Sequence, residues 1–150
     1  MHQVGRRQAR ADADFDLFQA DKGLFSAILS TRPGGEIILL SPCYEGVSPS
    51  HPECVDLGAF EDDELEALAR DPASGRDPLS IAEMMYLNTA TRHGKVTVVS
   101  EGITPEVAAK LGFGHVAPEA FPAYLARIMR DGKRLGIIHH SAETLPLIEE

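Results

Sequence analysis

The first strongly patterned stretch of the chain covers residues 14–30. A helical projection at 100° per residue places six apolar side chains on one arc of about 140°: Leu17, Phe18, Leu24, Phe25, Ile28 and Leu29. This pattern predicts an amphipathic helix with its apolar face on the core. Asp21 falls inside the same arc, which is unusual for a core helix, and Gly23 is the position at which a bend is expected.

Four apolar runs further along the chain predict strands: 36–40, 95–100, a weaker run at 114–118, and 134–140. Helical stretches lie between and around them, at 61–70, 78–92, 105–111 and 118–130. Asp77-Pro78 and Thr104-Pro105 each combine an N-cap residue with proline at the first helical position. The alternation predicts an α/β fold: a parallel, possibly mixed, sheet of about four strands flanked by helices in Rossmann-like layers.

The composition places bounds on the class of protein. With 150 residues the chain is expected to form one domain, and its net charge of −9 argues against nucleic acid or an anionic membrane as a partner. No apolar run approaches the roughly 18 residues of a membrane span. Two cysteines without a C-x-x-C pattern, and no signal-peptide segment, favour a cytoplasmic protein. The polar, Arg-rich residues 1–10 are expected to form a disordered or atypical arm ahead of a domain at 11–150.

Polar and small residues follow three of the predicted strands, in the segments 41–46, 100–102 and 139–144. Ligands of parallel sheets bind beyond the carboxyl ends of the strands, so these segments predict one edge of a binding site. Cys43, Glu45, Gly46, His140 and Thr144 are its candidate residues. The alternative is that glycine and serine serve only to turn the chain.

Two other kinds of chemistry are less well supported. Cys43 could act as a nucleophile with Glu45 or His139 as its partner, although a buried and inert cysteine is the commoner case. His139 and His140 are adjacent on a predicted strand and therefore point to opposite faces, so no metal site is predicted from this chain alone. The common nucleotide-binding and hydrolase motifs are absent from the sequence.

Gln19 and Lys22 are three residues apart and share a face at the border of the apolar arc. Lys22 could simply extend its stem over apolar surface and leave its ammonium in water. Alternatively, the two side chains form an anion site, with the ammonium neutralising a carboxylate and the amide hydrogen-bonding beside it. The residues alone leave both interpretations open.

Several segments resemble the C-terminal domain of the nickel-dependent lactate racemase family, in the same order. "ADADFDLFQADKGLFSA" is similar to that family's Q-A-x-K-G segment, and "PGGEIILLSPCYEG" to its PGG turn, strand and C-x-E-G. "KVTVVSEGI", "EVAAKLGFGHV" and "LGIIHHSAETLPLI" resemble its later strands and its H-G-x-x-T-L-P element. Together they cover about residues 11–148.

The resemblance implies a cleft-closing domain of a 2-hydroxy-acid racemase or epimerase, in which Lys22 and Gln19 position and polarise the substrate. The nickel-pincer nucleotide and the catalytic histidines of that family belong to an N-terminal domain. No residue of this chain matches them, so the isolated chain is expected to be inactive and to bind no cofactor by itself. Its expected partners are an N-terminal racemase domain, in trans or lost, and a small 2-hydroxy acid.

The sequence departs from the family at several points. It contains no tryptophan, which the family uses at the substrate, and it has Ser141 where the closing motif has glycine. Larger hydroxy acids than lactate are therefore equally compatible. The alternative function is a stand-alone, non-enzymatic α/β module that binds a small carboxylate or a protein.

Overall fold

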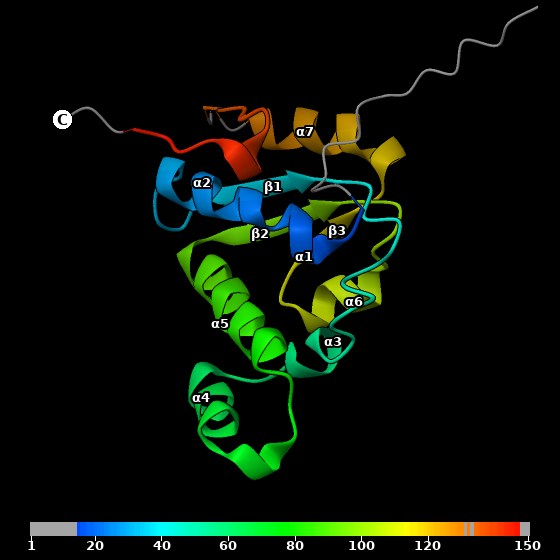
Figure 1. Cartoon of the computed structure of the whole chain (residues 1–150). Coiled ribbons are helices and arrows are strands. Elements are labelled where there is room, and N and C mark those ends of the chain that lie inside the picture. The colour runs from blue at the N-terminus through cyan, green and yellow to red at the C-terminus, as the bar shows by residue number, and fades with distance from the viewer. Residues whose placement is uncertain (1–14, 131, 133, 148–150) are drawn as a thin grey trace, which may run out of the picture.

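The computed structural model describes residues 15–130, 132 and 134–147. Its centre is a parallel sheet of three strands in the order β1-β2-β3 (Figure 1). The strands are β1 (Glu36–Leu40), β2 (Lys95–Val99) and β3 (Gly114–Val116). Helices lie on both faces of this sheet, so the α/β class predicted from the sequence is confirmed.

Two helices form the crossovers between the parallel strands. The long α5 (Pro78–His93) leads from β1 to β2, and α6 (Pro105–Lys110) leads from β2 to β3. Each begins at the proline that the sequence indicated, after an Asp77 or Thr104 side chain that accepts backbone N–H groups of the first turn. The strands are in register from Glu36 beside Lys95 to Leu40 beside Val99.

One face of the sheet carries the hydrophobic core. Alternation along the strands directs Ile37, Leu39, Val96 and Val98 to this face, where all four are buried. They belong to one core cluster with residues of α1 (Leu17–Ala20), α2 (Lys22–Ser30), α3 (Cys54–Leu57), α5 and α6. Leu17 and Leu24 are fully buried in this cluster.

A helical extension reaches beyond this core, consisting of α4 (Asp62–Arg70) and the short 3₁₀ helix η1 (Pro72–Ser74) (Figure 1). The Asn88 side chain of α5 holds the start of α4 by donating to the carbonyl of Phe60 at 3.1 Å and to the Asp62 carboxylate at 2.9 Å. Arg92 adds an ion pair to Asp62 at 2.8 Å. These polar contacts act together with Leu65 of α4, which is fully buried in the core cluster, to hold the extension against α5.

The second face of the sheet is covered by the 3₁₀ helix η2 (Pro118–Ala120) and by α7 (Phe121–Met129). No residue of α7 is buried. Its Tyr124 hydroxyl contacts the Glu36 carboxylate and lies 2.9 Å from Lys95 Nζ and 3.3 Å from the Thr97 hydroxyl. The polar contacts of Tyr124 therefore link α7 to β1 and β2.

The segment 134–140 is not a strand, so this part of the prediction is wrong. Leu135 and Ile137 are 47% and 71% exposed, and the chain continues into the 3₁₀ helix η3 (Ser141–Glu143). An apolar run becomes a strand only when a neighbouring strand takes up its backbone N–H and C=O groups. The apolar run 135–138 resembles a strand in composition but does not pair with a neighbouring strand.

The predicted first helix is divided in two at Asp21, which is both the C-cap of α1 and the N-cap of α2. Phe25 and Leu29, placed on the core face by the helical projection, are 53% and 39% exposed. The single apolar arc predicted for residues 14–30 therefore does not describe the core-facing side of both helices. The predicted arm at 1–10 lies outside the described residues. Among the described helices, none is long and apolar enough to span a membrane.

Candidate functional site

Gln19 and Lys22 lie together at the junction of α1 and α2. Asp16 caps α1 by accepting the backbone N–H of Gln19 at 2.9 Å, which fixes the first turn. Lys22 is exposed, and its ammonium donates to the Gln19 side-chain oxygen. Within the described residues this ammonium forms no ion pair with a carboxylate. It is therefore a surface cation, held in place by an amide, that an anion can approach.

The loop after β1 supports the start of α1. The carbonyl of Gly46 accepts the N–H of Leu17 at 3.0 Å, and the N–H of Glu45 donates to the carbonyl of Phe15 at 2.9 Å. Glu45 is exposed, whereas Cys43 is fully buried, with a left-handed backbone at φ 44°. Burial removes the Cys43 thiol from solvent, which argues against its use as a nucleophile.

The loop after β2 packs against the loop after β1. The Ser100 hydroxyl donates to the carbonyl of Pro42 at 2.8 Å, and the N–H of Gly102 donates to the same carbonyl at 2.9 Å. A side chain at Gly102 would overlap the backbone of Cys43. The predicted approach of these two loops at one edge of the sheet is therefore observed.

The third predicted loop, 139–144, packs on α2. The Ser26 hydroxyl lies 2.9 Å from the carbonyl of Ser141 and also contacts the carbonyl of Thr144. Gly23 lies directly beneath Ser141, and any β-carbon there would overlap the Ser141 side chain. His140 is exposed with φ 52°, and the Thr144 hydroxyl donates to its carbonyl at 3.0 Å.

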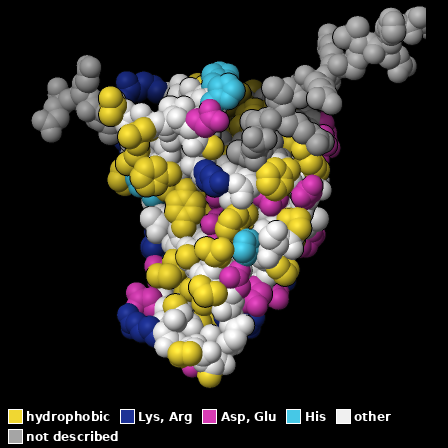
Figure 2. Space-filling model, in the orientation of Figure 1, with side chains coloured by type: hydrophobic (Ala, Val, Ile, Leu, Met, Phe, Trp, Pro, Cys, Tyr) yellow, Lys and Arg dark blue, Asp and Glu magenta, His cyan; other side chains and the backbone are white. Residues whose placement is uncertain are grey.

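The predicted site residues thus approach the α1–α2 junction from two sides. Glu45 and Gly46 lie beside the start of α1, and His140 and Thr144 lie in the loop on α2. Gln19 and Lys22 are on the chain between them. Figure 2 shows hydrophobic side chains interspersed with charged ones over the face that carries α1 and α2. Phe25 and Leu29, one and two turns beyond Lys22 on α2, are exposed apolar residues.

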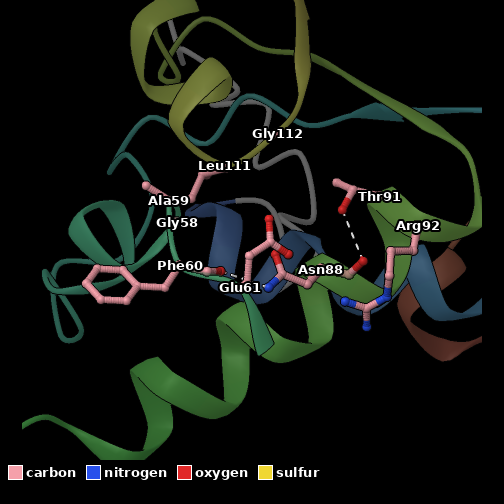
Figure 3. A pocket seen from close by; sticks show the side chains of 9 residues that line it. All are labelled: Gly58, Ala59, Phe60, Glu61, Asn88, Thr91, Arg92, Leu111 and Gly112. Carbon is pink, nitrogen blue, oxygen red and sulfur yellow. Dashed lines mark hydrogen bonds between the residues drawn. The ribbon is translucent and has the colours of Figure 1, made fainter. Parts of the chain in front are cut away.

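A pocket of about 260 Å³ lies elsewhere, between α3, α5 and α6 (Figure 3). Glu61, Asn88, Thr91 and Arg92 contribute its polar side chains. Asn88 and Arg92 already hold the start of α4, as described above. None of the candidate site residues lines this pocket, so the pocket and the candidate site are separate features.

The most unusual electrostatic feature was missed by sequence reasoning. Asp21 is only 2% exposed and hydrogen-bonds through its side chain to Glu83 of α5, which is itself half-buried. Burial, followed by the hydrogen bond and charge of Glu83, raises the pKa of Asp21 to about 11. Burial also raises the pKa of Glu83. The position of Asp21 inside an apolar arc was the one signal in the sequence for this pair.

A second polar pair lies at the start of α5. His51 Nδ1 is 2.6 Å from Asp77, and the ring of His51 stacks on Phe18 with centroids 4.7 Å apart. Hydrogen bonds from Ser80 and then from His51 lower the pKa of Asp77 to about 2. The sequence identified Asp77 as a helix cap, but a contact across 26 residues leaves no signal in local spacing.

Comparison with known proteins gives a match among solved structures. No protein-family model matches the chain, and no curated protein sequence matches it. Among solved structures, the lactate racemase apoprotein from Thermoanaerobacterium thermosaccharolyticum is similar, with a TM-score of 0.59 and 15% sequence identity. The match covers 79% of this chain and 28% of the racemase chain.

At this identity the likeness establishes a fold and not a function. The chain is an α/β domain resembling part of lactate racemase, and it spans just over a quarter of the matched protein. Among the described residues, no group of three or more His, Cys, Asp or Glu side chains is arranged to hold a metal ion. The residues described here therefore do not fit a nickel site.

Proposed function

We propose that this chain is the cleft-closing domain of a lactate-racemase-like 2-hydroxy-acid racemase or epimerase. Lys22 would bind the carboxylate or polarise the hydroxyl of the substrate, and Gln19 would orient it. The observation that carries this proposal is the Lys22 ammonium, held by Gln19 on the surface without a carboxylate partner among the described residues. The likeness in fold to part of lactate racemase supports it.

The chemistry of the pair suits a 2-hydroxy acid. A lysine ammonium is a compact charge with three donors, which neutralises a carboxylate, and an amide can donate to and accept from a neighbouring hydroxyl. Because Asp16 fixes the first turn of α1, both side chains start from an ordered backbone. The chain would thus bind and orient the substrate. Hydride transfer would be supplied by a nickel-pincer nucleotide in a partner domain, against which this face would close.

Titration of the isotope-labelled chain with L-lactate, followed by NMR, tests the binding role. We expect amide shifts at residues 19–22 and in the loop 140–144. Lys22→Ala should weaken binding at least tenfold, because it removes a charged hydrogen bond worth roughly 1.5–3 kcal/mol. Lys110→Ala, which removes an exposed lysine at the end of α6, is the matched control and should leave the affinity unchanged. Shifts that are equal in both variants would contradict the proposal.

A pull-down from the native lysate, with mass spectrometry and nickel analysis, tests the enzymatic role. Recovery of a nickel-containing partner, and racemase activity that Lys22→Ala abolishes, is the expected result. If lactate binds but no nickel-containing partner is recovered, the alternative holds: a stand-alone module that binds a small carboxylate. The exposed Lys22–Gln19 pair would bind a carboxylate in either case. Recovery of a nickel-containing partner therefore distinguishes a racemase domain from a stand-alone binding module.

A further inference from the structure

The buried carboxyl groups of Asp21 and Glu83 lack a hydrogen-bond donor unless one of them is protonated. Asp21 Oδ2 and Glu83 Oε1 are both inaccessible to solvent and have no donor among the described residues. Ionised carboxylates only accept hydrogen bonds, so two of them side by side would be unsatisfied as well as mutually repelling. With one proton on Asp21, its hydroxyl donates to Glu83, and the pair carries a single negative charge.

Titratable groups on several neighbouring elements surround Asp21 and Glu83. Asp16 and His51 precede α1 and α3, Lys22 begins α2, and Cys54 lies in α3. Asp77 caps the start of α5 and Tyr86 is on α5 with Glu83; the Tyr86 hydroxyl donates to the backbone carbonyl of Asp21 at 2.9 Å. Burial is the main cause that raises the pKa of Cys54, to about 11, and of Tyr86. Both therefore stay neutral near pH 7.

Lys22 is the cation whose behaviour depends on the pair. Its charge is felt by both Asp21 and Glu83, and it follows Asp21 directly in the chain. Two ionised carboxylates behind it would attract the ammonium into an internal ion pair. The ammonium instead lies on Gln19. A shared proton, which halves the negative charge behind Lys22, accounts for this arrangement.

We propose that Asp21 and Glu83 share one proton and act as positioning residues that keep the Lys22 ammonium available to a carboxylate ligand. The inference rests on the proposed function for the ligand, but the shared proton rests on the geometry of the two buried carboxyl groups alone. The two parts can therefore be tested separately.

The shared proton should make the free energy of unfolding decrease as the pH rises. The folded state keeps the Asp21 proton up to about pH 11, whereas the unfolded chain releases it near 3.8. The stabilising contribution is complete below the unfolded value and declines as pH rises toward the folded one, by up to tenfold in the folding equilibrium per pH unit. Asp21→Asn cannot ionise in either state, so it should remove this decline.

Infrared titration and urea unfolding between pH 5 and 9 test the proton. We expect the C=O stretch of a protonated carboxylic acid in the wild-type chain at pH 8, its loss in Asp21→Asn and its retention in Glu83→Gln. Unfolding midpoints of Asp21→Asn should depend less on pH than those of the wild type. Absence of the band in the wild-type chain would overturn the proposal. Should Asp21→Asn fail to fold, the wild-type and Glu83→Gln spectra still decide the question.

Binding of L-lactate at pH 7 tests the effect on Lys22. Glu83→Gln removes the remaining negative charge behind the ammonium, so the affinity should rise by roughly three- to tenfold. Glu119→Gln, an exposed residue of η2 on the other face of the sheet, is the matched control and should leave the affinity unchanged. An unchanged affinity in Glu83→Gln would overturn the positioning role. Failure of the wild-type chain to bind lactate, with the infrared band present, would instead overturn the proposed function.

Discussion

The two faces of the sheet are built on different principles. On one face, Val96 and Val98 of the central strand are buried with Leu17 and Leu24 in a continuous core under α1, α2 and α5. On the other, α7 contributes no buried residue, and Tyr124 contacts Glu36 and Lys95 through polar groups. Leu40, at the end of β1, stays 57% exposed on that side.

The two faces of the sheet are therefore expected to contribute differently to the stability of the domain. The packed face buries enough apolar area to stabilise the fold, and it also carries the Lys22–Gln19 pair at its surface. On the other face Val99 of β2 is buried, but α7 itself contributes no buried side chain, so α7 is expected to open locally before the rest of the domain unfolds. Three substitutions test whether the two faces contribute differently to stability.

The largest effect is expected from Leu24→Ala. Leu24 is completely buried in α2, and truncation of a buried leucine removes its transfer free energy and leaves a cavity. We expect the free energy of unfolding to fall by roughly 2–5 kcal/mol, measured by urea denaturation with circular dichroism. A loss below about 1 kcal/mol would mean that the packed face is less dense than its burial indicates.

An intermediate effect is expected from Tyr124→Phe. The substitution removes the hydroxyl that contacts Glu36 and Lys95 but keeps the ring, so about 1 kcal/mol should be lost. Hydrogen exchange should show roughly fivefold faster exchange in α7 and no change in α5. Equal acceleration in both helices would show that α7 unfolds only together with the core.

The smallest effect is expected from Leu40→Ser on the face under α7. Its side chain is largely exposed, so the free energy of unfolding should change by no more than about 0.5 kcal/mol. The same urea titration as for Leu24→Ala gives a direct comparison of the two faces. A loss approaching that of Leu24→Ala would mean that Leu40 is covered in solution.

Local signals made most of the fold predictable. Proline and cap residues located the starts of α5 and α6, and β-branched runs located β1 and β2, because these features act over a few residues. The loops after β1 and β2 were expected to meet, since the carboxyl ends of parallel strands share one edge, and Pro42 and Ser100 do so. The residues 134–140 show the limit: they have a strand's composition but no strand beside them.

The candidate site was less predictable, because its unusual features depend on contacts distant in sequence. Gln19 and Lys22 were visible as a pair from their spacing, and the structure joins them by a hydrogen bond. Asp21 was recognised only as a misplaced charge. Its partner Glu83 is 62 residues further on, so only the packing of α5 against the α1–α2 junction could reveal the buried pair.

The burial of both cysteines provides a practical means of following this domain. The side chains of Cys43 and Cys54 are both fully buried, and the raised pKa of Cys54 keeps its thiol in the unreactive protonated form. A cysteine introduced at an exposed position such as Leu145 would then be the one thiol among the described residues open to a maleimide dye. Fluorescence from that label would report the approach of a partner to α2 without removal of either native cysteine.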